Sequence, residues 1–292
     1  MTLRDAPGLL LGLIGSGIEA SRAPALHEGE AAEQGLRCIY KLIDITKLGV
    51  GADALPELLV AAERMGFAGL NITHPCKQAV IPHLHELSPD ARALGAVNTV
   101  LLRDGRRIGC NTDWFGFAEN FRRNLPDVPL GRVVQLGAGG AGAAVAHATL
   151  TLGAGQLTIF DIDNHRMAAL VDSLCARFGA GRAVAGMDVA AAVAVADGLI
   201  NATPIGMADH PGMPLPQELL RSALWIAEII YFPLETALLR SARAMGCRTL
   251  DGGGMAVFQA AEAFRLFTGI VPDSARMLRH FATMTEDTAV TA

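Results

Sequence analysis

Apolar and polar positions along the chain follow two periods, one typical of buried strands and one typical of helices. Short apolar runs, such as Leu9–Ile14 and Cys38–Ile43, predict strands. Stretches with apolar residues three and four positions apart, such as Leu55–Met65 before Gly66, predict amphipathic helices. Because the two patterns alternate along most of the chain, the sequence predicts an α/β protein.

Within its first 112 residues the chain contains further elements of both kinds and no glycine-rich phosphate loop. Turn residues separate them, including Gly35 after the first helix and Asp104-Gly105 between two strands. The expected elements are a helix over Pro24–Gln34, a strand over Gly69–Thr73, a helix over Cys76–His85, and hairpin strands over Thr99–Arg103 and Arg107–Cys110.

A second region follows a turn-rich segment, Pro126–Pro129, and again alternates strands with helices, which predicts an open parallel sheet. Met255–Thr268 predicts a late helix that packs back on the first region. The expected domains are 1–112 for substrate binding, 113–130 for a hinge helix (Asp113–Asn124) and linker, 131–250 for a dinucleotide, and 251–292 for C-terminal helices.

The strongest local signal is a glycine-rich turn between a predicted strand, Arg132–Leu136, and a helix that runs to about Leu152. Gly137 allows a tight turn, Gly139 lets the backbone approach a pyrophosphate, and Gly142 lets helix and strand pack closely. The pyrophosphate would meet free N–H groups at a helix N-terminus. We therefore expect a Rossmann domain whose cofactor contacts include Gly137, Ala138, Gly139, Gly140, Ala141 and Gly142.

The next predicted strand ends at an acid, Asp161, which bears on the identity of the nucleotide. A carboxylate there accepts hydrogen bonds from both ribose hydroxyls and repels a 2′-phosphate, so Asp161 favours NAD over NADP. Ile162 follows, so no guanidinium stands directly beside the ribose, although Arg166 is close enough in sequence to turn towards a phosphate. We count Asp161, Ile162 and Arg166 among the expected cofactor contacts.

Composition narrows the class of protein further. The 292 residues are 51% hydrophobic and 18% charged, with a net charge of −5, so neither nucleic acid nor an anionic membrane is an expected partner. No apolar run is long enough to span a bilayer. The five cysteines form no C-x-x-C pair, and without a secretory signal they indicate reduced thiols in a cytoplasmic protein. His83 and His85 have no third ligand near them in sequence, so no metal site is expected.

Polar residues also gather in six short segments where packing alone would not require them. These are Ser21–His27, Asn71–Lys77, Gly95–Thr99, Asn111–Asp113, Asn201–Met207 and Gly252–Gln259. Their motifs, N-x-T-x-P-x-K, G-A-x-N-T, N-T-D-x-x-G-F, G-A-G-G-A-G, N-A-T-x-x-G-M and G-M-x-x-x-Q, stand in the order of the shikimate/quinate dehydrogenase family. The chain resembles that family from Gly12 to Phe281.

The resemblance implies an α/β substrate domain, a C-terminal Rossmann domain that binds NAD(P), which Asp161 narrows to NAD, and an active site in the cleft between them. It implies oxidation of a secondary alcohol on a ring carboxylate, namely shikimate or a relative such as quinate or aminoshikimate. It pairs Lys77, as the proton acceptor, with Asp113, which orients substrate and lysine.

Further roles follow from the same resemblance. The substrate contacts would be Ser21, Thr73, Asn98, Tyr231 and Gln259. The nicotinamide side would include Thr203, Met207, Gly252 and Met255, although the two methionines are equally consistent with core packing.

The chain departs from the family at Ala23, where a second hydroxyl would normally help Ser21 to hold the substrate carboxylate. One lost charge-assisted hydrogen bond is worth about 1.5–3 kcal/mol. Arg22 compensates if it turns inwards; otherwise the substrate differs at that end. Two alternatives therefore stay open, an NAD-binding sensor of the same fold and a dehydrogenase for another polyol acid. A homodimer is compatible with the sequence.

Overall fold

The computed structural model describes residues 8–290 as backbone and side chains as far as residue 284. The chain divides into two compact units, and each is described by itself. The first unit comprises Met1–Thr112 and Gln259–Ala292, and the second comprises Asp113–Phe258. The outer limits that we expected for the domains, residues 1 and 292, lie outside the described residues.

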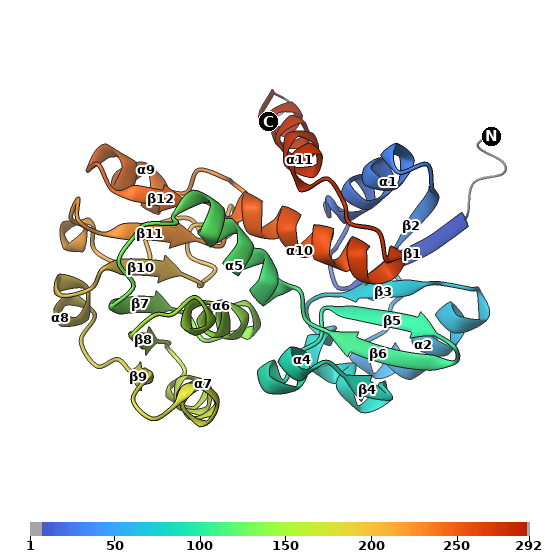
Figure 1. Cartoon of the computed structure of the whole chain (residues 1–292), viewed down its shortest axis with the longest axis horizontal. Coiled ribbons are helices and arrows are strands. Elements are labelled where there is room, and N and C mark those ends of the chain that lie inside the picture. The colour runs from blue at the N-terminus through green and yellow to red at the C-terminus, as the bar shows by residue number, and fades with distance from the viewer. Residues whose placement is uncertain (1–7, 291–292) are drawn as a thin grey trace. The chain divides into compact units, whose positions relative to one another are not determined.

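A mixed sheet of six strands, in the order β2-β1-β3-β5-β6-β4, forms the centre of the first unit (Figure 1). Strand β1 is parallel to β2 and β3, whereas β5 is antiparallel to β3 and β6. The expected hairpin is present and turns at Asp104, which has a φ of 51°. The strands are β1 (Gly8–Gly15), β2 (Arg37–Asp44), β3 (Gly69–Ile72), β4 (Glu86–Leu87), β5 (Thr99–Arg103) and β6 (Arg106–Cys110).

The described part of the first unit also contains five complete α-helices. The helix that we expected over Cys76–His85 is wrong in its extent, because α3 ends at Ala79. Pro82 cannot donate a backbone hydrogen bond, so the chain continues as a short 3₁₀ turn over Ile81–His83. The helices are α1 (Ala23–Glu33), α2 (Leu55–Arg64), α3 (Cys76–Ala79), α4 (Pro89–Leu94) and α11 (Ser274–Val290), with a 3₁₀ turn at Ala52–Ala54.

Helix α11 is fixed to α1 by a buried carboxylate. Arg276 donates to both oxygens of Glu30, at 2.7 and 2.9 Å, and the backbone N–H of Asp273 donates to Glu30 as well. The side chain of Glu30 has no exposed surface, so these donors replace the water that it loses. The C-terminal segment thereby becomes part of the first unit.

The second unit contains an all-parallel sheet in the order β12-β11-β10-β7-β8-β9, which confirms the expected open sheet (Figure 1). The strands are β7 (Arg132–Leu136), β8 (Gln156–Phe160), β9 (Ala183–Ala185), β10 (Gly198–Asn201), β11 (Trp225–Glu228) and β12 (Arg248–Leu250). The helices are α5 (Asp113–Asn124), α6 (Gly140–Thr151), α7 (Asn164–Phe178), α8 (Val189–Ala194) and α9 (Ala237–Ala244), with a 3₁₀ turn at Gln217–Leu219. Helix α10 (Gly252–Thr268) begins in the second unit and belongs to the first from Gln259 onwards.

Two apolar clusters cover the two faces of this parallel sheet. One includes Phe117, Val145 and Trp225, and the other includes Leu199 and Leu238. Strands β10 and β11 are buried at every position, as expected for a sheet covered on both faces. The strand order reverses between β7 and β10, and ligands of such sheets bind at the carboxyl ends of the strands at this point.

Candidate functional site

The glycine-rich turn lies at the carboxyl end of β7, where the strand order reverses. Gly137 has a φ of 99°, and a Cβ there would come within 2.4 Å of the carbonyl oxygen of Ala202. A Cβ on Gly142 would meet the carbonyl oxygen of Gly137 at 2.5 Å, whereas one on Gly139 would have no neighbour within 4 Å. Two glycines thus permit close backbone packing, and the third leaves the start of α6 open, as a bound pyrophosphate requires.

The carboxylate of Asp161 follows β8 and is held by three donors. It accepts from the backbone N–H of Ala138 at 2.6 Å, from that of Asp163 at 2.8 Å, and from Arg166 at 2.6 Å. Burial raises the pKa of Asp161, but the Arg166 guanidinium and the two N–H groups outweigh that effect and keep the pKa low. The acid is therefore ionised and fixed beside the glycine-rich turn, while the neighbouring Ile162 is fully exposed.

Asn201, at the end of β10, organises the loop that contains Thr203 and Met207. Its Oδ1 accepts from the backbone N–H and the hydroxyl of Thr203, and its Nδ2 donates to the carbonyl of Ile205 at 3.0 Å. Its Nδ2 also donates to Glu228, which is 1% exposed at the end of β11. The loop that we expected beside the nicotinamide is thus anchored to a buried carboxyl group.

Two expected cofactor residues, Gly252 and Met255, lie in the first turn of α10. A Cβ on Gly252 would come within 2.4 Å of the carbonyl oxygen of Ile229, so only glycine fits against that backbone. Met255 is 9% exposed and belongs to the apolar cluster with Phe117. Its packing is that of a core residue, which was one of the two roles open to it.

Lys77 and Thr73 lie just after β3 in the first unit, and backbone hydrogen bonds fix both. Thr73 donates its N–H to the carbonyl of Ile14 at the end of β1, at 2.9 Å. The carbonyl of Lys77 accepts from the N–H of Val97, also at 2.9 Å. The lysine, on the short helix α3, is thereby tied to the segment that carries Asn98, and its side chain is partly exposed.

Asn98 belongs to a cluster of polar side chains in the first unit. Its Oδ1 accepts from the backbone N–H of Thr112 at 2.8 Å, and its Nδ2 donates to the Thr112 hydroxyl at 3.0 Å. Gln259 lies beside both, with Oε1 3.5 Å from Nδ2 of Asn98 and 3.4 Å from the Thr112 hydroxyl. The structure thus brings two expected substrate residues together, although they lie 161 positions apart.

Ser21 precedes α1, and its Oγ accepts from the N–H of Ala23 at 3.3 Å. Since a hydroxyl that accepts from the backbone retains its own proton, Ser21 can donate to an anion. The preceding loop is held by Asp44, which accepts from the N–H groups of Gly17 and Ile18. Ala23 is the first residue of α1, so a hydroxyl there would stand at the helix N-terminus.

The remaining expected residues belong to the second unit. Asp113 is the first residue of α5 and is 8% exposed, whereas Tyr231, after β11, is 49% exposed. Lys77 belongs to the first unit and Asp113 to the second, so their pairing stays a prediction.

The sequence analysis missed two residues that hold the nucleotide side together. Gln135 is fully buried in β7, and its Nε2 donates to the carbonyls of Gly137 at 2.8 Å and Gly142 at 2.9 Å. Glu228 anchors Asn201. Both lie at or next to the carboxyl end of a strand, Gln135 in β7 and Glu228 at the end of β11, and this position was the available signal for them.

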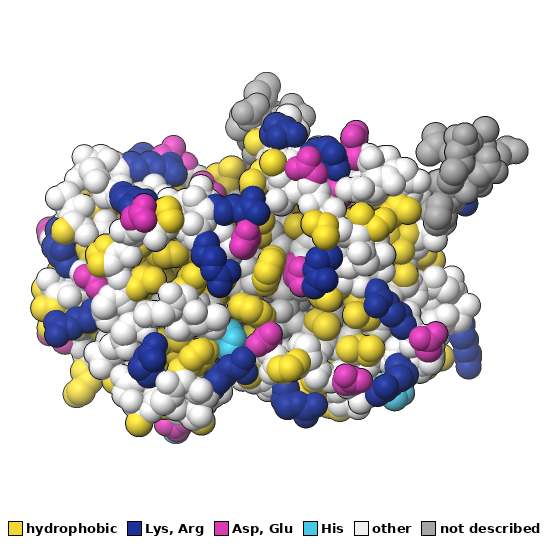
Figure 2. All heavy atoms as spheres, viewed as in Figure 1, with side chains coloured by type: hydrophobic (Ala, Val, Ile, Leu, Met, Phe, Trp, Pro, Cys, Tyr) yellow, Lys and Arg dark blue, Asp and Glu magenta, His cyan; other side chains and the backbone are white. Residues whose placement is uncertain are grey.

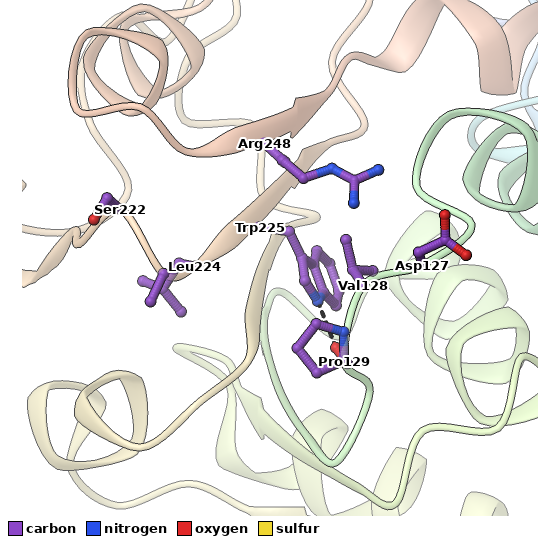
Figure 3. A pocket seen from close by; sticks show the side chains of 8 residues that line it. Asp127, Val128, Pro129, Ser222, Leu224, Trp225 and Arg248 are labelled. Atoms are coloured by element: carbon purple, nitrogen blue, oxygen red, sulfur yellow. Dashed lines mark hydrogen bonds between the residues drawn. The ribbon is translucent and has the colours of Figure 1, made fainter.

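A cavity of about 120 Å³ in the second unit lies away from the glycine-rich turn (Figure 3). Trp225 and Arg248, which begin β11 and β12, line it together with the linker, and Trp225 donates to the carbonyl of Pro129 at 2.8 Å. It therefore lies at the amino ends of the strands and not at the glycine-rich turn.

Acidic and basic side chains are interspersed on the face shown in Figure 2. Among the described residues, no three His, Cys, Asp or Glu side chains form a group that could hold a metal ion. Within the same residues, none of the helices combines the length and the apolar character needed to cross a bilayer.

Two models of known protein families match this chain, one in its N-terminal part and one in its C-terminal part. Residues 13–100 match the shikimate dehydrogenase substrate binding domain, and residues 252–280 match the shikimate 5′-dehydrogenase C-terminal domain. The first match includes Ser21, Lys77 and Asn98, and the second includes Gln259.

Individual relatives match nearly the whole chain. A shikimate dehydrogenase (NADP(+)) of Streptomyces avermitilis is 62% identical over 96% of this chain and 97% of its own. A quinate/shikimate dehydrogenase (NAD(+)) of Corynebacterium efficiens is 49% identical over 94% of this chain and 98% of its own. The solved quinate dehydrogenase of Corynebacterium glutamicum in complex with NAD is 46% identical, with a TM-score of 0.90 over 95% of this chain and 99% of that one.

The buried carboxyl group of Glu228 should make the free energy of unfolding depend on pH. Burial raises its pKa to about 7 from the ordinary 4.5, so between these values the folded protein binds a proton that the unfolded chain has released. The contribution of Glu228 to stability is therefore greatest below pH 4.5 and decreases as the pH rises through 7, by about 3 kcal/mol. Urea denaturation of wild type and Glu228→Gln should show this decrease only in wild type.

The exposed Glu235, whose side chain is 55% exposed, provides the control. Glu235→Gln should retain the wild-type pH profile. Equal pH profiles for wild type and Glu228→Gln would show that Glu228 titrates at its ordinary pKa.

Proposed function

The chain belongs to the shikimate/quinate dehydrogenase family of oxidoreductases, which act on CH–OH groups, and we propose that it oxidises shikimate or a close relative to the 3-dehydro ketone with NAD as acceptor. The observation that carries the proposal is that the Asn98 and Gln259 side chains lie together beside Thr112, next to the segment to which the backbone of Lys77 is bonded. Those side chains suit a hydroxylated ring, because buried amides discriminate strongly between ligands that pair with them and ligands that do not.

A dinucleotide fits the second unit. The open space at Gly139, the N-terminus of α6 and the ionised Asp161 offer a phosphate site and a ribose site in the order that a dinucleotide needs. When bound, the nicotinamide ring accepts the hydride that leaves the alcohol carbon. We propose Thr203 and Met207 on the nicotinamide side, with the loop held by Asn201.

The chemistry assigned to the protein is proton transfer and orientation. Lys77 takes the hydroxyl proton onto its amine nitrogen while the alcohol carbon loses its hydrogen as hydride, so the alcohol becomes a ketone and the lysine an ammonium. Asp113 orients the lysine and the hydroxyl, and Asn98, Thr73, Tyr231 and Gln259 hold the ring. Ser21 donates to the ring carboxylate from the start of α1, where the helix dipole also favours an anion.

The choice of NAD rests on Asp161. The relatives differ in the coenzyme for which they are named, which is NADP(+) for the Streptomyces enzyme and NAD(+) for the Corynebacterium enzymes. In this chain the Asp161 carboxylate, with 5% of its side chain exposed, follows β8, the position at which a Rossmann domain of this kind would meet the adenosine ribose, and there it would repel a 2′-phosphate. Arg166 forms an ion pair with that carboxylate, so the positive charge of the guanidinium is already compensated in the absence of a coenzyme.

Replacement of Lys77 tests the catalytic role. Lys77→Ala should lower kcat with shikimate by about a thousandfold, the usual size of a general base effect, with NAD affinity nearly unchanged. Lys77→Arg should not restore turnover, because a guanidinium does not accept a proton near neutral pH. The exposed Lys41 on β2 provides the control, and Lys41→Ala should retain wild-type kcat.

The same assay, run by NADH formation with shikimate, quinate and aminoshikimate, also tests the reaction itself. If wild type binds NAD and oxidises none of the three, the protein is better assigned as an NAD-binding sensor or as a dehydrogenase for another polyol acid.

Replacement of Asp161 tests the coenzyme. Wild type should have a higher kcat/KM with NAD than with NADP, and Asp161→Asn should raise the NADP-to-NAD ratio at least tenfold, since an adjacent like charge costs about 1–4 kcal/mol at such sites. Asp163→Asn is a matched control, because asparagine caps α7 as well as aspartate does. A wild-type preference for NADP would contradict the assignment of Asp161.

Restoring a second hydroxyl at position 23 tests how the carboxylate is held. Ala23→Ser should lower the KM for shikimate about tenfold, the value of one charge-assisted hydrogen bond of about 1.5 kcal/mol. Ala25→Ser, two residues further along α1, should leave the KM unchanged. An unchanged KM in Ala23→Ser would mean that the substrate carboxylate lies elsewhere.

A further inference from the structure

Tyr40 is a buried phenol on β2, the edge strand of the first sheet. It is 5% exposed, and its hydroxyl lies 2.8 Å from Oδ1 of Asn71 on β3, so the side chain reaches across β1. Burial raises the pKa of Tyr40, which therefore remains protonated. The ring of His27 stacks on the tyrosine ring, with 5.0 Å between centroids, and fixes its position.

The hydrogen-bond partners of Asn71 determine the orientation of its amide group. Its Nδ2 lies 3.3 Å from the carbonyl oxygen of Asn98, and a carbonyl can only accept, so this atom must be the amide nitrogen. Oδ1 then faces Tyr40, and the phenol has to donate to it. Nδ2 also donates to the hydroxyl of Thr99 at 3.1 Å.

The orientation of the Asn71 amide determines the direction of the hydrogen bond between Thr99 and Asn98. Having accepted from Asn71, the Thr99 hydroxyl directs its own proton to Oδ1 of Asn98 at 3.0 Å. The same Oδ1 accepts the N–H of Thr112, which can only donate. Both contacts identify this atom as the oxygen of the Asn98 amide. The other atom is then Nδ2, which donates one N–H to the Thr112 hydroxyl at 3.0 Å and lies 3.5 Å from Oε1 of Gln259.

We propose that Tyr40, Asn71 and Thr99 are positioning residues that hold Asn98 with its Nδ2 as a hydrogen-bond donor to a substrate oxygen. This inference rests on the proposed function, since it takes Asn98 and Gln259 as substrate contacts. The group that faces Asn98 is then a hydroxyl or carbonyl oxygen and not an ammonium, which would set N–H against N–H. A substrate hydroxyl that accepts from Asn98 has its proton free for another acceptor.

The first test removes the phenol oxygen. Tyr40→Phe should raise the KM for shikimate about fivefold, corresponding to one neutral hydrogen bond of about 1 kcal/mol, with kcat within twofold and the KM for NAD unchanged. Phe267→Leu is the control, because Phe267 lies in the same apolar cluster as Tyr40 and outside the hydrogen-bonded chain. It should lower stability without raising the KM. Equal KM values in wild type and Tyr40→Phe would overturn the proposal.

The second test asks whether the residues act as one chain. Thr99→Val breaks the link to Asn98 and should raise the KM for shikimate, whereas Thr99→Ser keeps the hydroxyl and should restore it. Adding Tyr40→Phe to Thr99→Val should then cause little further change, since the link is already broken. Independent effects, in which the two factors multiply, would contradict a chain that transmits polarity.

A readout without substrate separates this proposal from the proposed function. The backbone amide of Thr112 donates to Asn98, so its hydrogen exchange should accelerate in Tyr40→Phe and not in Phe267→Leu. If wild type oxidises no substrate but the exchange responds, the proposed function fails while the positioning chain holds. Unchanged exchange in Tyr40→Phe would refute the chain whatever the enzyme oxidises.

Discussion

The constraint on which the structure depends is that polar groups at the carboxyl ends of its strands lose water and need protein partners. Gln135 satisfies the carbonyls of the glycine-rich turn, Glu228 satisfies Asn201, and three donors satisfy Asp161. In the first unit, Thr112 and Thr99 do the same for Asn98. Each satisfied group is also oriented, because a buried amide or carboxylate with several partners has one favourable position.

Orientation is what the proposed chemistry requires of the two units. The nucleotide unit needs an open helix N-terminus and a fixed carboxylate, and its glycines and Asp161 supply them. The substrate unit needs amides of defined polarity next to a lysine, and the link between Lys77 and Val97 places α3 against the Asn98 segment. Most of the groups that maintain these positions are not among the proposed substrate or coenzyme contacts.

Ala23 and Asp161 are the two positions at which we propose that single side chains affect substrate and coenzyme binding. Ser21 and the N-terminus of α1 are present while the second hydroxyl is absent, which would weaken the binding of a carboxylate without a change in fold. At Asp161, the carboxylate paired with Arg166 is the group that we propose favours NAD over NADP. Both proposals concern single side chains on a fold that this chain shares with the solved quinate dehydrogenase at a TM-score of 0.90.

The sequence by itself determined the α/β class, the glycine-rich turn, the hairpin at Asp104 and the open parallel sheet, because these follow from local periodicity and turn chemistry. It overextended the helix after Cys76 and gave no role to Gln135, Glu228 or Tyr40. Their roles depend on partners far along the chain, as Tyr40 depends on Asn71 across an intervening strand. Only the tertiary structure decided the roles of these three residues. Hydrogen bonds form between groups that are close in space, and the spacing of two residues along the sequence does not tell how close they are.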